Sequence, residues 1–479
     1  MDSVTLDGLG TAPLLFAGIA LAILVGWGAF RLFLNSFRYL AATPVQRDRL
    51  RLAWRISARW KRLAPNIGLA RVDQNTKGVR DWQGNTKATV TVVPKIKTYP
   101  EPWGVRVLVS TIPKVGLEEW EKAAGWLADA WQVETVEVNR LKPSVLEVRA
   151  VVGNPLDEHR PYSWPAADSW VLPIGHNPWG REIGISLRQL SGIKVAGMPA
   201  YGKTTLMLGW VAALAGRPEV QFAFFDGKTS DPRYGDWGEV GSRAMFVVGD
   251  NPEAANQKLT ELVRLIKDRP AALVEERGTH RFWKTGPTTE NPLVLVVMDE
   301  CHNYADTLGL TGKDKQLIDH NKRMMQTISK EGRSVGVLGI FGTQKQTSDA
   351  IPTAVRDNLE AGVCFAVATI DAGEAALGAA IRKDPDNDPT ALVDKDASVG
   401  VCVVTGLPGL GARYDRVRVG DLDEDQVAQY IASTAALRRD VIPAPAPVVT
   451  DVSAAADETM AGQTVPLQKK TNARRRKAS

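Results

Sequence analysis

The stretch from Val195 to Met207, VAGMPAYGKTTLM, combines residue types that can hold a chain of phosphate groups. Gly197 and Gly202 are followed by Lys203 and Thr204, in the G-x-x-x-x-G-K-T spacing of a phosphate loop. In such a loop, backbone N–H groups and a helix N-terminus face the phosphates, the lysine reaches the β and γ phosphates, and the hydroxyl coordinates Mg²⁺. The stretch therefore predicts a site for ATP and Mg²⁺. The residues expected to form it are Gly197, Met198, Pro199, Ala200, Tyr201, Gly202, Lys203, Thr204 and Thr205.

Two residues depart from the small, flexible types that such loops usually carry. Pro199 lacks an N–H donor and stiffens the chain. Tyr201 is bulky, and we expect it to pack at the outer edge of the loop; in the alternative, it projects outward and stacks on a base or on a neighbouring subunit. We predict that Pro199→Gly and Tyr201→Ser variants retain ATP binding.

A pair of carboxylates follows a second apolar run, PLVLVVMDE. A fully apolar strand is expected at the centre of a parallel sheet, and Asp299 at its end can hold Mg²⁺ together with Thr204. Glu300 beside it is the candidate general base that polarises the attacking water. In the alternative, the pair only closes a strand at a helix N-terminus. The phosphate loop upstream favours the catalytic interpretation.

Three further residues are candidates for the same chemistry. Gln344 follows Thr343 at the end of the apolar run VGVLGIFGTQ, where it is placed to sense the γ phosphate. Arg333 and Arg356 are candidates to act in trans on a neighbour's nucleotide. For each arginine, a structural ion pair or a solvated surface position is the alternative.

The elements that must position these residues alternate between strands and helices over residues 181–438, which predicts an α/β motor domain with a largely parallel central sheet. VGVCVVTG and RYDRVRV are expected to add edge strands to it. Residues 88–155 predict a small α+β domain with the order β-β-α-β-β, and residues 156–180 a linker. Residues 439–479 are rich in proline and alanine, end in KKTNARRRKAS, and are expected to be a disordered tail with a basic end.

The N-terminal region indicates a membrane anchor, because residues 8–30 contain no charged side chain. We expect a transmembrane helix at 12–34, a short N-terminus at 1–11 outside the cytoplasm, and the rest of the chain inside, because the basic segment 35–87 follows the helix. This places the protein in the cytoplasmic membrane as a single-pass protein. A signal peptide, disfavoured by Asp2 and Asp7, and a buried soluble helix are the alternatives. The basic segment either lies on anionic lipid or forms a solvated helix.

Composition excludes other classes of site. The three cysteines form no C-x-x-C pair, and the five histidines form no H-x-x-x-H motif. A disulfide framework and a zinc site are therefore not expected. The net charge of +5 is modest, but basic residues concentrate near both ends of the chain. The C-terminal basic run could contact nucleic-acid phosphates or lipid headgroups, or be a solvated tail.

The order of these pieces resembles the FtsK/SpoIIIE family of DNA-pumping ATPases. The resemblance runs through REIGISLRQLSGIKVAGMPAYGKTT, FAFFDGKTSDPRYGDW, VVMDECHNY and EGRSVGVLGIFGTQKQTSDAIP, and places Asp226 and Lys228 on the family's DPK motif. It implies a RecA-like motor domain in a homo-hexameric ring, with double-stranded DNA in the pore. The chain departs from the family in PAYGKT, DGK and the KQ pair after Gln344. Its short form resembles the transfer proteins of actinobacterial conjugative plasmids.

Three functions are compatible with this pattern. The leading hypothesis is a membrane-anchored, ATP-driven translocase of double-stranded DNA that acts in conjugative transfer or segregation. A protein-secretion ATPase on a related motor fold is the second, although those proteins usually carry several motor domains in tandem. A membrane scaffold with vestigial nucleotide binding is the third, and the intact Lys203, Thr204, Asp299 and Glu300 argue against it.

Overall fold

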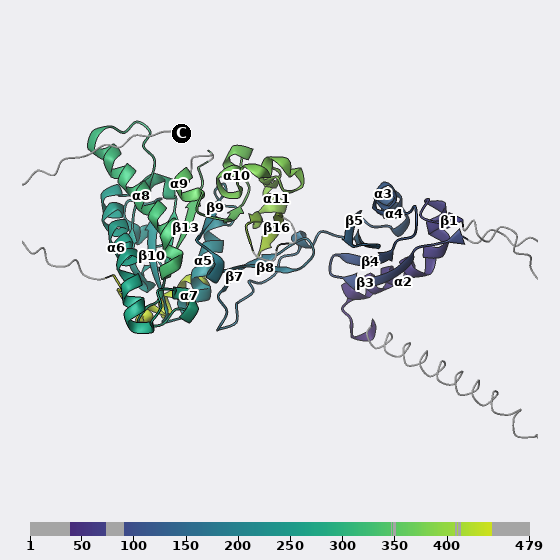
Figure 1. Cartoon of the computed structure of the whole chain (residues 1–479), viewed down its shortest axis with the longest axis horizontal. Helices are drawn as coiled ribbons and strands as arrows, with labels where there is room; N and C mark the ends of the chain where they lie inside the picture. Colours follow the sequence, from purple (N-terminus) through teal and green to yellow (C-terminus); the bar gives the residue numbers. More distant parts are fainter. Residues whose placement is uncertain are drawn as a thin grey trace, which may run out of the picture. The chain divides into compact units, whose positions relative to one another are not determined.

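The structure is a computed structural model, and it describes residues 39–72, 91–345, 347, 351–407, 410 and 413–442. It contains a four-stranded antiparallel sheet in the N-terminal part of the described chain and a ten-stranded mixed sheet in the C-terminal part (Figure 1). A short antiparallel pair, β1 (Arg71–Val72) with β2 (Thr91–Val92), precedes the smaller sheet along the chain.

The smaller sheet belongs to the predicted α+β domain. Its strand order is β3-β4-β6-β5. The elements are β3 (Lys95–Glu101), β4 (Gly104–Ser110), α3 (Leu117–Lys122), α4 (Ala124–Trp131), β5 (Thr135–Lys142) and β6 (Val145–Val151). This differs from the expected β-β-α-β-β order in that the single predicted helix is divided into α3 and α4 at Ala123. Alternate residues such as Val107 and Val148 are fully buried, and their neighbours are partly exposed. One face of this sheet therefore forms the core, as the period of two predicts.

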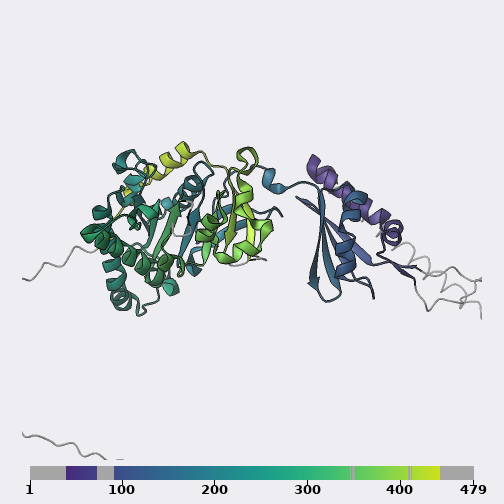
Figure 2. The same cartoon turned by 90° about the horizontal axis from the view of Figure 1, so that it is seen from above.

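Helix α2 (Pro44–Asn66) corrects the expectation that the basic segment 35–87 either lies on anionic lipid or forms a solvated helix. Its apolar residues recur at helical spacing, and they are buried in the same core as the smaller sheet: Leu52, Ala53, Ile56, Trp60 and Ala64. Trp60 stacks on Trp120 with ring centroids 5.2 Å apart. Figure 2 shows the purple helix lying along the blue sheet. An amphipathic pattern reveals a buried face but not what covers it, and here the cover is protein.

The larger sheet is the α/β sheet expected over residues 181–438, and it is mixed. Across the sheet, its strands are β11 (Ala244–Val248), β10 (Val220–Asp226), β12 (Leu293–Asp299), β13 (Val337–Thr343), β9 (Gly192–Ala196), β14 (Ala361–Cys364), β15 (Val401–Thr405), β16 (Tyr414–Val419), β7 (Val171–His176) and β8 (Glu182–Ser186). The pairs from β11 to β14 are parallel, and those from β14 to β8 are antiparallel. Every residue of β10, β12 and β13 is buried, as is typical of central parallel strands.

Helices cover both faces of the parallel part. The chain crosses from β9 to β10 and on to β11 in one direction and returns from β11 through β12 to β13 in the other, so right-handed crossovers place α5 opposite α6 and α8. Figure 1 shows α6 and α8 on one side of β10 and β13, and α5 on the other. The helices are α5 (Lys203–Ala215), α6 (Pro252–Arg277), α7 (Phe282–Thr285), α8 (Gly312–Val335), α9 (Thr353–Arg356), α10 (Ile370–Leu377), α11 (Lys395–Ser398) and α12 (Glu424–Ser433).

Two expectations about the larger sheet were wrong, one about a domain boundary and one about which strands lie at its edges. The expected linker 156–180 contains β7, which pairs with β8 and, through Gly175 and His176, with β16. The runs VGVCVVTG and RYDRVRV do form strands, but β15 and β16 lie inside the sheet, and β8 and β11 form its edges. Proline and tryptophan in the segment suggested a loop, whereas pairing with a distant strand makes part of it sheet.

Several N- and C-terminal predictions concern residues that the structure does not describe. The expected transmembrane helix at 12–34, the N-terminus at 1–11 and nearly all of the tail at 439–479 lie outside the described residues. Among the residues that are described, none of the helices combines the length and the apolar character needed to span a bilayer.

Candidate nucleotide site

Most of the candidate residues come together at the carboxyl ends of the parallel strands of the larger sheet. The parallel strands β9, β13, β12 and β10 all end there, and in register Thr343 lies beside Ala196 and Asp226 beside Asp299. Ligands of open α/β sheets bind at the carboxyl ends of the strands. β13 lies between β9 and β12, which brings Gln344 between the phosphate loop and the two carboxylates. Motifs far apart in the sequence therefore form one site.

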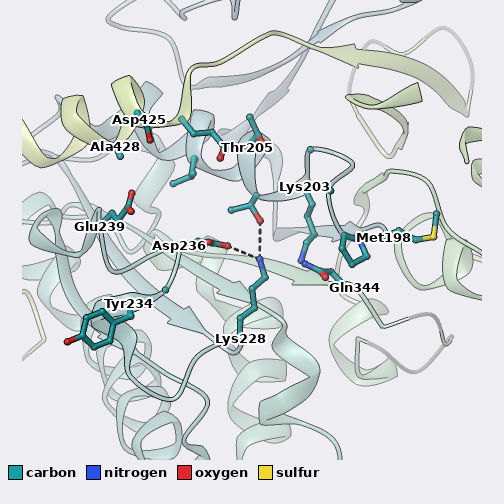
Figure 3. A pocket seen from close by; sticks show the side chains of 17 residues that line it. Met198, Lys203, Thr205, Lys228, Tyr234, Asp236, Glu239, Gln344, Asp425 and Ala428 are labelled. Atoms are coloured by element: carbon teal, nitrogen blue, oxygen red, sulfur yellow. Dashed lines mark hydrogen bonds and ion pairs between the residues drawn. The ribbon is translucent and has the colours of Figure 1, made fainter. Parts of the chain in front are cut away.

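The loop after β9 turns directly into α5, which begins at Lys203. Gly202 has a φ of 102°, which favours glycine, and Ala200 has a φ of 66°, which costs a residue with a side chain roughly 1–2 kcal/mol. The loop borders a pocket of about 570 Å³, a volume typical of small-molecule sites (Figure 3). Among the predicted residues, the pocket is lined by Met198, Pro199, Ala200, Gly202, Lys203, Thr204, Thr205 and Gln344.

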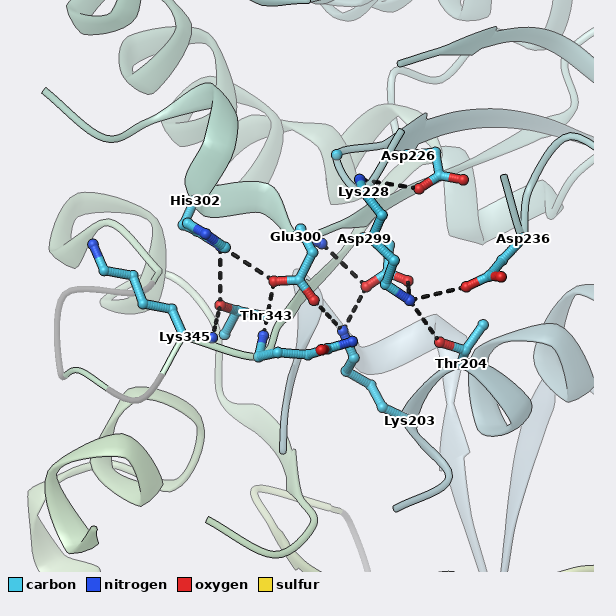
Figure 4. Close-up of polar contacts among 12 residues, drawn as sticks. Lys203, Thr204, Asp226, Lys228, Asp236, Asp299, Glu300, His302, Thr343 and Lys345 are labelled. Atoms are coloured by element: carbon cyan, nitrogen blue, oxygen red, sulfur yellow. Dashed lines mark hydrogen bonds and ion pairs between the residues drawn. The ribbon is translucent and has the colours of Figure 1, made fainter. Parts of the chain in front are cut away.

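Lys203 is paired with both predicted carboxylates. Its Nζ lies 2.6 Å from Asp299 Oδ1 and 2.8 Å from Glu300 Oε1 (Figure 4). All three side chains are buried, with Lys203 3% and Asp299 0% exposed. A charge that is taken out of water needs such partners, because unpaired burial is strongly destabilising. A phosphate group that binds in the loop must therefore compete with Asp299 and Glu300 for the Lys203 ammonium group.

Lys228 approaches Asp299 from the other side. Its Nζ lies 2.9 Å from Asp299 Oδ2, 2.9 Å from Asp236 Oδ2 and 3.2 Å from Thr204 Oγ1 (Figures 3 and 4). Asp226 anchors the backbone of this residue, because its Oδ1 accepts the N–H of Lys228 at 3.2 Å. The two predicted metal ligands, Thr204 and Asp299, thus point at one common position, which the ammonium group occupies.

Glu300 is held by three neighbours. Its Oε1 accepts from Lys203, while Oε2 accepts the backbone N–H of Gln344 at 2.9 Å and lies 3.3 Å from His302 Nδ1. The residue has a φ of 51°, in the left-handed region that non-glycine residues rarely adopt. Such strained positions cluster at functional sites. The geometry fits a base that is oriented by Gln344 and His302 and that must release Lys203 before it can polarise water.

Burial and neighbouring charges shift the pKa values of three groups in the site. Burial alone would raise the pKa of Asp299, but Lys203 and Lys228 outweigh it and hold that pKa below its ordinary value. Burial would likewise raise the pKa of Glu300, and the bonds from His302 and Lys203 lower it overall. Burial would lower the pKa of Lys228, whereas Asp299 and Asp236 raise it overall. Asp299, Glu300 and Lys228 are therefore charged at neutral pH.

Tyr201 points away from the pocket. It is 2% exposed, and its hydroxyl donates to the backbone oxygen of Val393 at 2.6 Å. The side chain therefore packs against the protein, as expected, and the alternative of outward projection onto a base or a neighbouring subunit is not observed, so Tyr201 does not contact the pocket through its ring. Pro199, by contrast, is exposed at the pocket wall. Thr205 also lines the pocket, and its hydroxyl is hydrogen-bonded to Glu424 at the start of α12.

Because Tyr201 is buried, the Tyr201→Ser variant is expected to lose stability although it retains ATP binding. We expect the free energy of unfolding to fall by about 3–5 kcal/mol, because the ring leaves a cavity. The matched variant Tyr201→Phe loses only the hydrogen bond and should cost about 1 kcal/mol. Urea unfolding measures both, and ATP titration below the melting temperature should show affinity retained in each. Equal stability of the two variants would show that the ring is not part of the core.

The two candidate arginines lie elsewhere. Arg333 is exposed in the last turn of α8, which leads into the first residue of β13, and Arg356 ends α9, shortly before β14 begins. Both therefore lie at the amino edge of the sheet, a strand's length away from the phosphate loop of their own chain, or roughly 20 Å. The structure does not bring them to this site, and a role in trans stays a prediction.

Three residues at the site were not assigned a catalytic or metal-binding role from the sequence: Lys228, Asp236 and His302. Lys228 was noted only as part of the DGK segment, and no local pattern marked Asp236 or His302. His302 follows Glu300 closely, so its proximity to that carboxylate could have been suspected. Asp236 lies eight residues after Lys228 and reaches it only because the chain turns back in the segment between them.

Comparison with known proteins supports the relationship suggested by the motifs. A curated protein named DNA translocase FtsK from Leptospira interrogans is 24% identical over 220 residues, which is 43% of this chain and 21% of the relative. Another of that name, from Staphylococcus epidermidis, is 24% identical over 230 residues, or 45% of this chain and 27% of the relative. The chain is similar in sequence to FtsK. It spans about a quarter or less of the length of these FtsK relatives. No family model matches the chain.

Two solved structures are also similar. The monomer form of the pCW3 conjugation coupling protein TcpA with ATPgS has a TM-score of 0.49 and 16% identity, and the match covers 79% of this chain and 99% of that chain. EssC (ATPases 2 and 3) from Geobacillus thermodenitrificans has a TM-score of 0.45 and 14% identity, with 61% of this chain and 54% of that chain covered.

Proposed function

We propose that this chain is an ATPase that uses hydrolysis to move double-stranded DNA. The observation that carries the proposal is that Lys203, Thr204 and Gln344 line one pocket at the carboxyl ends of parallel strands, while Asp299 and Glu300 contact Lys203 beside it. Each of these side chains has a part in phosphoryl transfer to water. The similarity to proteins named DNA translocase FtsK supports DNA as the moved polymer.

The residues divide the chemistry between them. Backbone N–H groups of the loop and the start of α5 bind the phosphates, and Lys203 shifts from Asp299 and Glu300 to the γ phosphate. Glu300 takes the proton of the attacking water, in a position fixed by the Gln344 N–H. The Gln344 side chain lies at the pocket wall, where it can contact the γ phosphate.

The donor set of the site fits Mg²⁺. Thr204 Oγ1 and Asp299 Oδ2 lie within 3.2 Å and 2.9 Å of one nitrogen, Lys228 Nζ, so two hard oxygen donors already face a position that holds a cation. When bound there, Mg²⁺ would neutralise charge on the β and γ phosphates. Thr204 and Asp299 would hold it.

The larger assembly is part of the same proposal. We infer a RecA-like motor that works as a homo-hexameric ring around double-stranded DNA, with Arg333 or Arg356 reaching a neighbour's nucleotide. An anchor at 12–34 would tether the ring to the cytoplasmic membrane with the N-terminus outside, for conjugative transfer or segregation. The apolar run at 8–30 and the basic residues after it support the anchor.

One experiment tests the function. The ATPase rate of the full chain is measured with and without long double-stranded DNA, beside a Lys203→Ala control. We expect DNA to raise the wild-type rate and Lys203→Ala to show no turnover. Turnover that DNA does not change would overturn the DNA assignment and favour the protein-secretion alternative. Absence of turnover in wild type, with or without DNA, would favour a scaffold with vestigial nucleotide binding.

A further inference from the structure

Three side-chain oxygens surround the Lys228 ammonium group and form a small oxygen cage. Its Nζ contacts Thr204 Oγ1 at 3.2 Å, Asp299 Oδ2 at 2.9 Å and Asp236 Oδ2 at 2.9 Å. These groups come from the start of α5, the end of β12 and the segment after β10. Figure 4 shows the three oxygens around one ammonium group, while Lys203 contacts the opposite oxygen of Asp299. Each of the two lysines therefore contacts a different carboxylate oxygen of Asp299.

The cage has the oxygen donors that a small divalent cation prefers. Mg²⁺ binds oxygen at about 2.0–2.1 Å and is held in proteins by one or two carboxylates together with phosphate oxygens. The lysine ammonium group is a compact point charge on a flexible stem, which makes it a suitable substitute for a metal ion. A cation within bonding distance of these oxygens and the ammonium group cannot share the position, because both need the same lone pairs.

The Lys228 side chain can move out of the oxygen cage. Its backbone is fixed by Asp226, but its side chain is 28% exposed, and it lines the same pocket as Thr204. Asp236, 49% exposed, also lines this pocket. The ammonium group can thus swing toward solvent and stay near a carboxylate, at a small cost compared with leaving Asp299 unpaired.

We propose that Lys228 is a displaceable internal cation, which competes with a divalent metal ion for the oxygens of Thr204, Asp299 and Asp236. A tethered ammonium group is present at high effective concentration, so a metal ion alone displaces it poorly. Nucleotide phosphates supply further oxygen ligands to the metal ion, so that the metal ion then displaces the Lys228 ammonium group. The metal therefore enters with the nucleotide and not before it. This inference rests on the proposed nucleotide site, and it assigns Lys228 a positioning role.

The test measures metal binding without nucleotide or DNA. Mn²⁺ is titrated into the full chain, and free Mn²⁺ is followed by electron paramagnetic resonance. We expect Lys228→Gln and Lys228→Met to bind one Mn²⁺ at least about tenfold more tightly than wild type, which corresponds to about 1.4 kcal/mol. Lys228→Arg keeps the charge and should bind as weakly as wild type. Two neutral variants are used so that the result does not depend on the folding of either, which thermal unfolding checks.

A matched control distinguishes the effect of where the lysine charge is removed from the effect of the change in net charge. Lys203→Gln removes the same charge from the same aspartate, but its nitrogen contacts Asp299 Oδ1 and Glu300 Oε1 instead of the cage. We expect this variant to gain much less Mn²⁺ affinity than Lys228→Gln. Equal gains would overturn the proposal, as would neutral Lys228 variants that bind Mn²⁺ no better than wild type. Because the assay contains neither ATP nor DNA, its failure is distinct from failure of the proposed ATPase function.

Discussion

Glu300→Gln is expected to lower the rate of ATP hydrolysis by about 100- to 10,000-fold while ATP binding is retained. General-base catalysis typically contributes an acceleration of this size, and an amide cannot take the proton of water. Glutamine preserves the shape of the side chain and an oxygen acceptor for the Gln344 N–H, so the pocket should stay formed. Single-turnover hydrolysis gives the rate, and a fluorescent ATP analogue gives the affinity.

The control for this prediction is Glu331→Gln. Glu331 belongs to α8 and forms a surface ion pair with Lys267 at 2.6 Å, and surface pairs of this kind contribute little. Its hydrolysis rate should equal that of wild type. If Glu300→Gln lost less than about tenfold in rate, Glu300 would not be the base, and its strained backbone would need another explanation.

The second large effect is expected for Asp299→Asn, which should lower the free energy of unfolding by about 3 kcal/mol or more. Asp299 is fully buried and is the anion that Lys203 and Lys228 share, so an amide leaves two ammonium groups with half of their partners. Chemical unfolding in urea at neutral pH gives the size of the loss. Asp236→Asn, at a half-exposed partner of Lys228, should cost no more than about 1 kcal/mol.

The pH dependence of this effect has a definite sign. The pKa of Asp299 in the folded protein lies below its ordinary value, so its contribution is present above the unfolded pKa of about 4 and is lost as the pH falls through the folded pKa. The stability difference between wild type and Asp299→Asn should therefore shrink as the pH is lowered below about 4. A difference that grew on acidification would contradict the assigned charge state.

Several features of the site could be predicted because each depends on a short stretch of chain. The phosphate loop, the Asp299–Glu300 pair and Gln344 each follow an apolar run, and the carboxyl ends of parallel strands meet at one edge of a sheet. Two predictions from local sequence were nevertheless wrong about what the segment packs against or pairs with. The apolar stripe of α2 is covered by the small sheet and not by lipid, and β7 pairs into the large sheet from a segment that was expected to be a linker.

From the sequence alone follow the candidates for binding phosphate, holding a metal ion and activating water, and the prediction that parallel strands carry them. Those properties reside in residue types and local spacing. Three features become visible only in the folded chain: Lys203 pairs with both carboxylates, oxygens of Asp236, Asp299 and Thr204 surround Lys228, and Tyr201 packs away from the pocket. These contacts cannot be predicted from local sequence, because a buried charge is stabilised by whichever partners the fold brings within a few ångströms, and those partners come from segments that no local pattern connects.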